Sequence, residues 1–436
     1  MAHRGVLTTR QRAALFDLPT DEASLLKHYT LDDEDIEHIR TRRRSENQIG
    51  FALQLCVFRY PGRLLKAGEV IPEPVCRFVA AQLGLKPDDL LPYAAREKTR
   101  REHLDALRKM YGYKMFSGKR AKKLRGWLDR NAEAAQSSQA LVRGFVEECR
   151  RQQIILPGTS VIERHCADAL VAAERRIEAR IAARLDANTR AKLDKLLAEE
   201  VDGRVSRFVW LRRFEVGKNS ADINRQLDRL EFLQRLALPP AILDDIPAHR
   251  VVQLRRQGER YFTDGLRDIT SDRRLAILAT CVVEWSAAIA DTVVETHDRI
   301  VGSIWREAKK ICDARVAEAQ SEIATTLAGF ETLGTTLLLA KGDEAAVAGA
   351  VDASCGWGVL ENFVANAGTL GKTVKSDALA YVEKGYHRFK LYASRMLTAL
   401  DIACSSVTEP LLAAADVIRD KQDIPSRSAP FLKPQS

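Results

Sequence analysis

Residues 271–305 read SDRRLAILATCVVEWSAAIADTVVETHDRIVGSIW, and their apolar or small side chains recur every three or four positions. That spacing places them on one face of an α-helix. The pattern predicts a helix that begins near Asp272 and runs to about Gln320, where glycines could end it and shorter helices follow. The positions that carry the pattern are Leu275, Leu278, Val282, Trp285, Ile289, Val293, Thr296, Ile300 and Ile304.

A helix of this length is longer than a small domain is wide, because each residue adds about 1.5 Å. It must therefore brace several units of one chain or pair with a second chain. Apolar residues spaced every three or four positions do not show whether the helix packs within its own chain or against a second chain. A core helix and a dimer interface therefore both remain open.

The same spacing continues upstream. Ser160 with Glu163 predicts a capping box at the start of one helix, and another is predicted after Ser220, ending at Pro239-Pro240. Alternating β-branched runs are nearly absent. The sequence therefore predicts an all-α protein with several helical bundles followed by long helices.

Composition excludes several classes of protein. The eight cysteines lie far apart with no CxxC pair, which indicates buried thiols in a reducing compartment rather than disulfides or a zinc site. We find no uninterrupted apolar run of about 18 residues and no signal-peptide pattern. The chain is predicted to be cytoplasmic, without a membrane partner.

The net charge of +9 is concentrated in the first third of the chain. Between Arg96 and Arg125, twelve basic residues face three acidic ones, a difference of +9. A second run, from Arg40 to Lys66, has seven basic residues against Glu46. The remainder is net acidic.

An isolated basic run is usually a solvated helix face, but two runs with little compensating acid indicate an anionic partner. Nucleic acid fits best, because lysine and arginine neutralise backbone phosphates and release counterions. An acidic membrane surface fits less well, since neither run has an apolar face suited to insertion.

The run from Arg40 to Lys66 also contains side chains that could read bases. Asn47 and Gln48 stand beside arginines, and these residue types make bidentate contacts to base edges. They could equally cap or bridge within the fold. The turn from Arg59 to Arg63 brings two guanidinium groups to a loop and predicts a phosphate clamp.

Motifs for catalysis are not found. The segment GTLGKT at residues 368–373 resembles a phosphate loop, but Asn366 stands where the motif requires glycine. The histidines form no HExxH pattern. We therefore predict no catalytic residue, metal site or cofactor in this chain.

Three segments closely resemble the N-terminal half of Tn3-family transposases: residues 14–65, REKTRREHLDALRKMYGY at 96–113, and residues 271–305. The resemblance runs from about residue 10 to the C-terminal segment. It implies N-terminal helical domains that bind the terminal inverted repeats of a transposon in double-stranded DNA, and helices that hold a homodimer together. In the family, a separate RNase H-like domain with two aspartates and a glutamate binds magnesium and cuts DNA.

No residue here matches that acidic triad, so the resemblance implies a DNA-binding part of a bacterial, nucleoid-associated transposase that is inactive alone. An alternative is a dimerisation module that acts as a non-catalytic subunit or inhibitor of intact transposase. Arg40 to Gln48 and Arg96 to Arg101 match basic stretches of the family's DNA-binding region. The predicted DNA contacts are Arg40, Arg42, Arg43, Arg44, Asn47, Gln48, Arg59, Arg63, Arg96, Lys98, Arg100, Arg101, Arg108, Lys109, Lys119, Arg120, Lys122, Lys123 and Arg125.

Four regions follow from these patterns. Residues 1–155 would be a basic helical DNA-binding domain and residues 156–270 a second one. Residues 271–400 would be a long-helix scaffold or dimerisation region. Residues 401–436, which end in DIPSRSAPFLKPQS, would be a linker toward a catalytic domain that this chain lacks.

Overall fold

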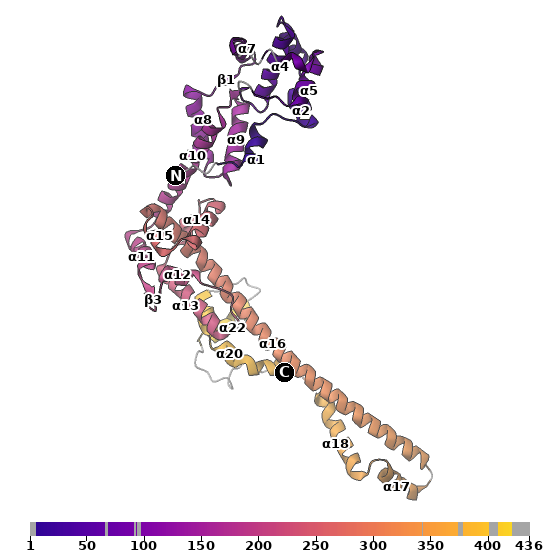
Figure 1. The fold of residues 1–436 in the computed structure, drawn as a ribbon. Coiled ribbons are helices and arrows are strands. Elements are labelled where there is room, and N and C mark those ends of the chain that lie inside the picture. Colours follow the sequence, from indigo (N-terminus) through magenta and orange to yellow (C-terminus); the bar gives the residue numbers. More distant parts are fainter. Residues whose placement is uncertain are drawn as a thin grey trace. The chain divides into compact units, whose positions relative to one another are not determined.

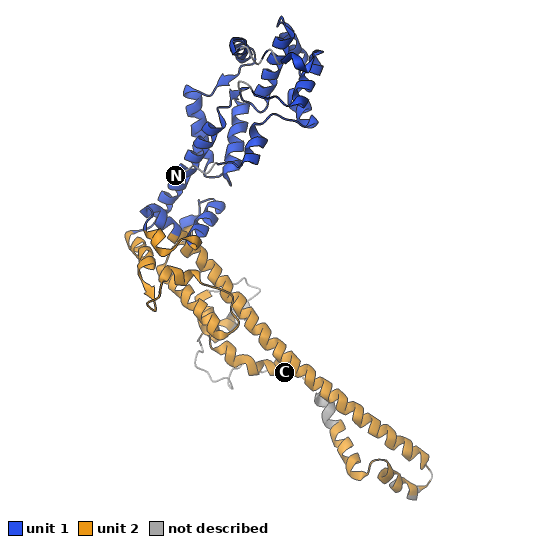
Figure 2. Cartoon of the chain, viewed as in Figure 1, with its two compact units in different colours: residues 1–186, 242–258, 268–277 blue, residues 187–241, 259–267, 278–436 orange. Residues whose placement is uncertain are grey.

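The predicted all-α fold is confirmed by the structure, a computed structural model. It describes residues 6–65, 69–90, 93, 97–341, 343–373, 378–400 and 409–420. The chain divides into two compact units (Figure 2). Unit 1 contains residues 1–186, 242–258 and 268–277, and unit 2 contains residues 187–241, 259–267 and 278–436. The boundaries of these units differ from those of the four predicted regions. The roles of the four regions remain predictions.

Unit 1 is built from short helices and one two-residue strand pair (Figure 1). Strands β1 and β2 are parallel and pair Lys114 with Ile154. The elements are α1 (Thr9–Phe16), α2 (Glu22–Tyr29), α3 (Asp33–Arg40), α4 (Ser45–Arg59), α5 (Glu73–Leu83), η1 (Pro87–Leu90), α7 (Glu97–Met110), β1 (Lys114–Met115), α8 (Gly118–Asn131), α9 (Ser138–Arg151), β2 (Ile154–Ile155), α10 (Thr159–Ala183) and most of α14 (Ala248–Arg260).

Two hydrophobic clusters hold unit 1 together. In the first cluster, α2, α3, α5 and α7 pack around α4, in which every residue from Ile49 to Phe58 is buried. The second joins α1, α8, α9 and α10 around Phe145 and Leu124. The turn between α3 and α4 holds three arginines of one predicted basic run, and α8 carries five basic residues of the other, so these clusters fix which side chains reach solvent.

Unit 2 also consists mainly of helices, with one antiparallel strand pair in which Glu200 faces Ser206. Helix α13 begins at Ser220, as predicted, and is capped by the Asn219 side chain. The elements are α11 (Ala187–Ala198), β3 (Glu200–Val201), β4 (Val205–Ser206), α12 (Arg207–Arg212), α13 (Ser220–Leu236), α15 (Thr263–Arg267), α17 (Glu344–Ser354), α18 (Trp357–Thr373), α19 (Leu379–Val382), η3 (Glu383–Gly385), α20 (Tyr386–Lys390), α21 (Ala393–Leu400) and α22 (Glu409–Asp420). The short helix η2 (Pro240–Leu243) lies where the chain passes from one unit to the other.

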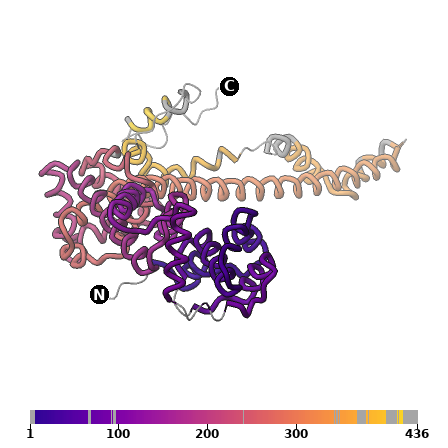
Figure 3. Tube along the Cα trace, turned by 90° about the horizontal axis from the view of Figure 1, so that it is seen from above, coloured from indigo at the N-terminus to yellow at the C-terminus, as the bar shows by residue number. Residues whose placement is uncertain are grey.

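Helix α16 (Ser271–Leu339) is longer than predicted, because it does not end near Gln320. Figure 3 shows it as one continuous helix with α18 beside its distal part. Gly329 does not break it but allows close packing, because a Cβ atom there would clash with the Phe363 ring of α18. The glycine reflects a helix–helix contact, which a pattern along one segment cannot reveal.

Two further sequence predictions are corrected. Helix α10 begins at Thr159 after Gly158 and has no side-chain cap, so the Ser160–Glu163 capping box is wrong. Glu163 instead accepts two hydrogen bonds from Arg12, at 2.8 and 3.0 Å. Helix α22 occupies residues that were predicted to be a linker. Residues 421–436 of that predicted linker lie outside the described part of the chain.

One helix of the described chain, α16, contains a window long and apolar enough to cross a membrane. Slightly more than half of that window is buried within the protein. The core helix of a water-soluble protein has the same properties, so this feature is weak support for a membrane location.

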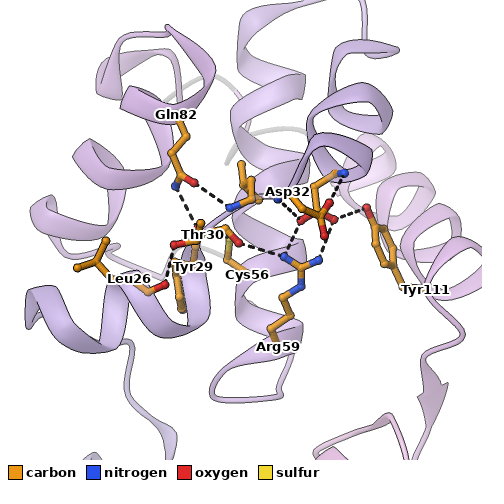
Figure 4. A network of polar contacts seen from close by, with 10 residues as sticks. Leu26, Tyr29, Thr30, Asp32, Cys56, Arg59, Gln82 and Tyr111 are labelled. Carbon is orange, nitrogen blue, oxygen red and sulfur yellow. Dashed lines mark hydrogen bonds and ion pairs between the residues drawn. The ribbon is translucent and has the colours of Figure 1, made fainter.

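A buried carboxylate joins three helices of the first cluster (Figure 4). Asp35 of α3 is 1% exposed and accepts two hydrogen bonds from the Arg59 guanidinium of α4, both at 2.7 Å. The Tyr111 hydroxyl, just after α7, donates a third at 2.8 Å, and the backbone N–H of Asp32 a fourth at 3.1 Å. This network fixes α3 against α4 and the end of α7.

The ion pair keeps Asp35 charged inside the fold. Burial alone would raise the pKa of Asp35, but the hydrogen bonds from Arg59, Asp32 and Tyr111 outweigh it and hold that pKa below its usual value. Because the folded-state pKa is lowered, the stabilisation is present above the unfolded pKa, which is about 3.9. It is lost as the pH falls through the folded-state value.

We predict that Asp35→Asn lowers the free energy of unfolding by about 3 kcal/mol at neutral pH, because it leaves the Arg59 charge without its buried partner. Hydrogen exchange of the α4 backbone amides should measure the loss directly. Arg43→Gln, an exposed position, is the matched control and should change stability by less than about 0.5 kcal/mol. Unchanged α4 protection in Asp35→Asn would contradict the role of the network.

Candidate nucleic-acid interface

Helix α8 presents the most concentrated basic surface of any single element in the described part of unit 1. Ala121, Leu124 and Leu128 recur at three- and four-residue spacing and are buried, and Leu124 and Leu128 belong to the second cluster. That packing turns the remaining positions outward. Five of the predicted contacts are exposed there: Lys119, Arg120, Lys122, Lys123 and Arg125.

The charge on α8 is largely uncompensated. Its only acidic residue is Asp129, and its first turn contains none. The N-cap Ser117 makes no side-chain cap bond. Cations in the first turn oppose the positive end of the helix dipole, so a bound anion would relieve the repulsion.

Helix α10 adds basic residues next to α8. Burial lowers the pKa of His165, and the charges of Arg125 and Arg164 lower it further. Arg164 is exposed, and the His165 ring lies 5.9 Å from the Phe116 ring. Our sequence interpretation did not include Arg164 or His165 among the contacts, because they lie outside the basic window and approach it only through packing of α8 on α10.

The predicted basic stretch from Arg40 to Gln48 includes the turn between α3 and α4. Helix α3 ends at Arg40 and α4 begins at Ser45. Arg40, Arg43 and Arg44 are exposed, and Arg44 lies 3.6 Å from the Glu46 carboxylate. Arg42 is turned inward, with its guanidinium 4.3 Å from the centre of the Phe51 ring. Three of the four arginines are therefore accessible to a ligand.

The side chains that could read bases are not freely presented. The Gln48 amide donates a 2.7 Å hydrogen bond to the Arg42 carbonyl, so Gln48 bridges within the fold, as the sequence also allows. The Asn47 Oδ1 atom is buried and has no hydrogen-bond partner among the described residues. This arrangement does not favour base readout by these two residues.

The predicted phosphate clamp at Arg59 and Arg63 is corrected by the structure. Arg59 is occupied by Asp35, as described above. Arg63 donates to the Phe16 carbonyl at 2.7 Å and forms an ion pair with Glu69, and its side chain is 12% exposed. Both guanidinium groups stabilise the fold, so neither is available for a phosphate.

Helix α7 also carries both cations that a ligand can reach and cations that are bound within the fold. Lys98 and Lys109 are exposed, and no partner is found for their side chains among the described residues. Arg101 and Arg108 pair with acidic residues of their own helix, at 2.6 and 3.0 Å. Arg100 donates to the Leu65 carbonyl. The predicted contact Arg96 lies outside the described residues.

The aromatic residues within the basic window pack inward. Tyr111 donates to Asp35, Tyr113 lies 5.1 Å from Phe58, and Phe116 lies 6.1 Å from Phe145. These rings are part of the two clusters and offer no stacking surface. The arrangement on α8 therefore suits contact with phosphate groups more than stacking on bases.

A family model described as a domain of unknown function, DUF4158, matches residues 6–169, which include α8 and the α3–α4 turn. The transposase for transposon Tn3926 from Escherichia coli is 31% identical over 441 residues and covers 100% of this chain. The transposases for Tn501 from Pseudomonas aeruginosa and for Tn1546 from Enterococcus faecium are 30% and 25% identical. They cover 100% and 98% of the chain, respectively.

The chain spans less than half the length of these relatives: 44%, 45% and 43%, respectively. The matched span is consistent with an N-terminal half of such a protein. Over its whole length, the chain is therefore similar to transposases of the Tn3 family.

Proposed function

We propose that this chain is the DNA-binding N-terminal portion of a Tn3-type transposase and that it recognises the terminal inverted repeats of a transposon. The observation that carries the proposal is the exposed, uncompensated basic face of α8. Similarity to transposases supports DNA as the anion. Site residues on α8 and on the α3–α4 turn would contact backbone phosphates, which sets position and affinity rather than sequence preference.

The proposal is confined to binding. Among the described residues, no group of three or more histidine, cysteine, aspartate or glutamate side chains is arranged to hold a metal ion. We assign no metal cofactor and no DNA cleavage to these residues. Action on DNA in a bacterial cytoplasm, in association with the nucleoid, is part of the same proposal.

We predict that Lys119→Gln, Lys122→Gln and Arg125→Gln together weaken binding to duplex DNA and reduce its salt dependence. The plot of log affinity against log salt has a negative slope, and each lost phosphate contact should reduce the magnitude of that slope by about 0.9. Fluorescence anisotropy with labelled duplex at several salt concentrations would measure both effects. Because the substituted side chains are exposed, the helical circular dichroism signal should not change.

The matched control is Lys27→Gln, Arg77→Gln and Lys86→Gln, which removes the same charge from exposed positions of unit 1 outside α8. This variant should keep most of the affinity and the salt slope. An equal loss in the two triple variants would mean that net charge, rather than the α8 surface, drives binding.

Sequence preference is a separate prediction. A duplex that carries the terminal repeat of the cognate transposon should bind more tightly than a scrambled duplex at every salt concentration. Base contacts and DNA deformation are largely retained when phosphate contacts are screened, so the ratio should persist as total affinity falls. Equal affinity for both duplexes would reduce the proposal to non-specific DNA binding.

A second candidate function, self-association, is favoured by apolar side chains on the distal part of α16. Leu327 is 62% exposed and Leu338 is 73% exposed, and both lie on one helical stripe because they are eleven residues apart. An apolar stripe of this kind is typical of a helix that packs against a second helix. We propose that two copies of the chain associate along it.

Light scattering should then detect a dimer. Leu327→Glu should weaken it, because a carboxylate would be buried in the contact, while Ala328→Glu, about 100° away on the same helix, should have a smaller effect. A monomer at high protein concentration would contradict self-association. It would leave the DNA-binding proposal unaffected.

A further inference from the structure

A basic pocket lies in unit 2, where none of the predicted DNA contacts is located. It has a volume of about 410 Å³ and is formed by side chains of α11, α12 and α13 and of the residue after α11. Four of its lining residues are cationic and one, Glu199, is acidic. The cations are Lys192, Lys195, Arg207 and Arg235.

Arg207 is held by aromatic rings rather than by a carboxylate. Its guanidinium carbon lies 4.8 Å from the centre of the Phe232 ring and 5.7 Å from that of Trp210. The two rings contact each other edge to face, at 6.0 Å between centres. Cation–π contact orients a guanidinium without neutralising its charge. The Arg207 Nε atom is buried and has no hydrogen-bond partner among the described residues.

Arg395, elsewhere in unit 2, is neutralised by acidic partners. It makes ion pairs with Asp228 and Glu231, both at 2.6 Å. In the pocket, the Lys192 and Lys195 side chains have no ion-pair partner among the described residues. Arg235 lies near Glu231, whose direct ion pair is with Arg395. The pocket therefore concentrates positive charge that the fold does not balance.

We propose that this pocket binds a phosphate group. Uncompensated cations with free donors suit a phosphate, and a guanidinium held in one orientation loses little freedom when it binds. The volume lies in the range of small-molecule sites, about 300–1000 Å³, so it leaves room for a sugar or base attached to the phosphate. The phosphate could belong to a free nucleotide or to a DNA strand.

Small ligands test the pocket independently of DNA binding. Inorganic phosphate, dAMP and deoxyadenosine are titrated into the full chain by calorimetry. Phosphate and dAMP should bind, and deoxyadenosine should not. Lys195→Gln with Arg235→Gln should weaken phosphate and dAMP binding about tenfold or more, through loss of charge-assisted hydrogen bonds.

Two further variants separate a site from general electrostatics. Lys309→Gln with Lys310→Gln removes the same charge from exposed positions of α16 in unit 2 and should leave phosphate affinity unchanged. Arg207→Lys keeps the charge but loses the planar contact with Phe232, and should weaken dAMP binding while circular dichroism stays unchanged. Equal phosphate affinity in the wild type and the pocket variants would overturn the proposal, as would equal losses in the pocket and control pairs.

Duplex DNA then distinguishes the source of the phosphate. If the pocket pair also weakens duplex binding and the control pair does not, the site takes a backbone phosphate. If duplex affinity is unchanged while dAMP binding falls, the site takes a free nucleotide. Loss of duplex binding only in the α8 variant would support the proposed function and, if the pocket pair still loses dAMP binding, would assign the pocket to a free nucleotide.

Discussion

The buried carboxylate of Asp35 is the constraint on which the architecture around α4 depends. A charge at 1% exposure is stable only with full compensation, and Arg59 and Tyr111 supply most of it. The hydrogen bonds to Asp35 fix α3, α4 and the end of α7 relative to one another. The α3–α4 turn lies at the other ends of these two helices, where the Gln48–Arg42 hydrogen bond and the contact of Arg42 with Phe51 hold it.

This constraint also explains why basic residues of one run have different roles. Arginine forms bidentate hydrogen bonds, so the fold uses it where a buried acceptor must be satisfied, as with Arg59, or where several carbonyls and a carboxylate converge, as with Arg63. Lysine holds its charge away from the backbone and stays solvated, as on α8. Charge counted along the sequence therefore overestimates the charge that a ligand can reach.

The sequence was sufficient for features set by local periodicity: the all-α fold and the start of α13. It was insufficient where the deciding partner is distant in the chain. Arg59 and Asp35 are 24 residues apart, Glu163 bonds Arg12 across 151 residues, and Gly329 is explained only by Phe363. The spacing of apolar residues predicts which face of a helix is apolar, but it does not predict which polar groups form hydrogen bonds or ion pairs with each other.

The two basic features differ in how their charge is supported, and this has consequences for binding. On α8 the cations are solvated and close together, so their effect on an anion is strongest at low salt and is readily screened. In the unit 2 pocket, aromatic rings hold Arg207 in one orientation beside Phe232, and the lining side chains converge on a volume of about 410 Å³. A concave site of this kind selects its ligand by shape as well as by charge. The first arrangement suits an extended polyanion, and the second suits a single phosphate group.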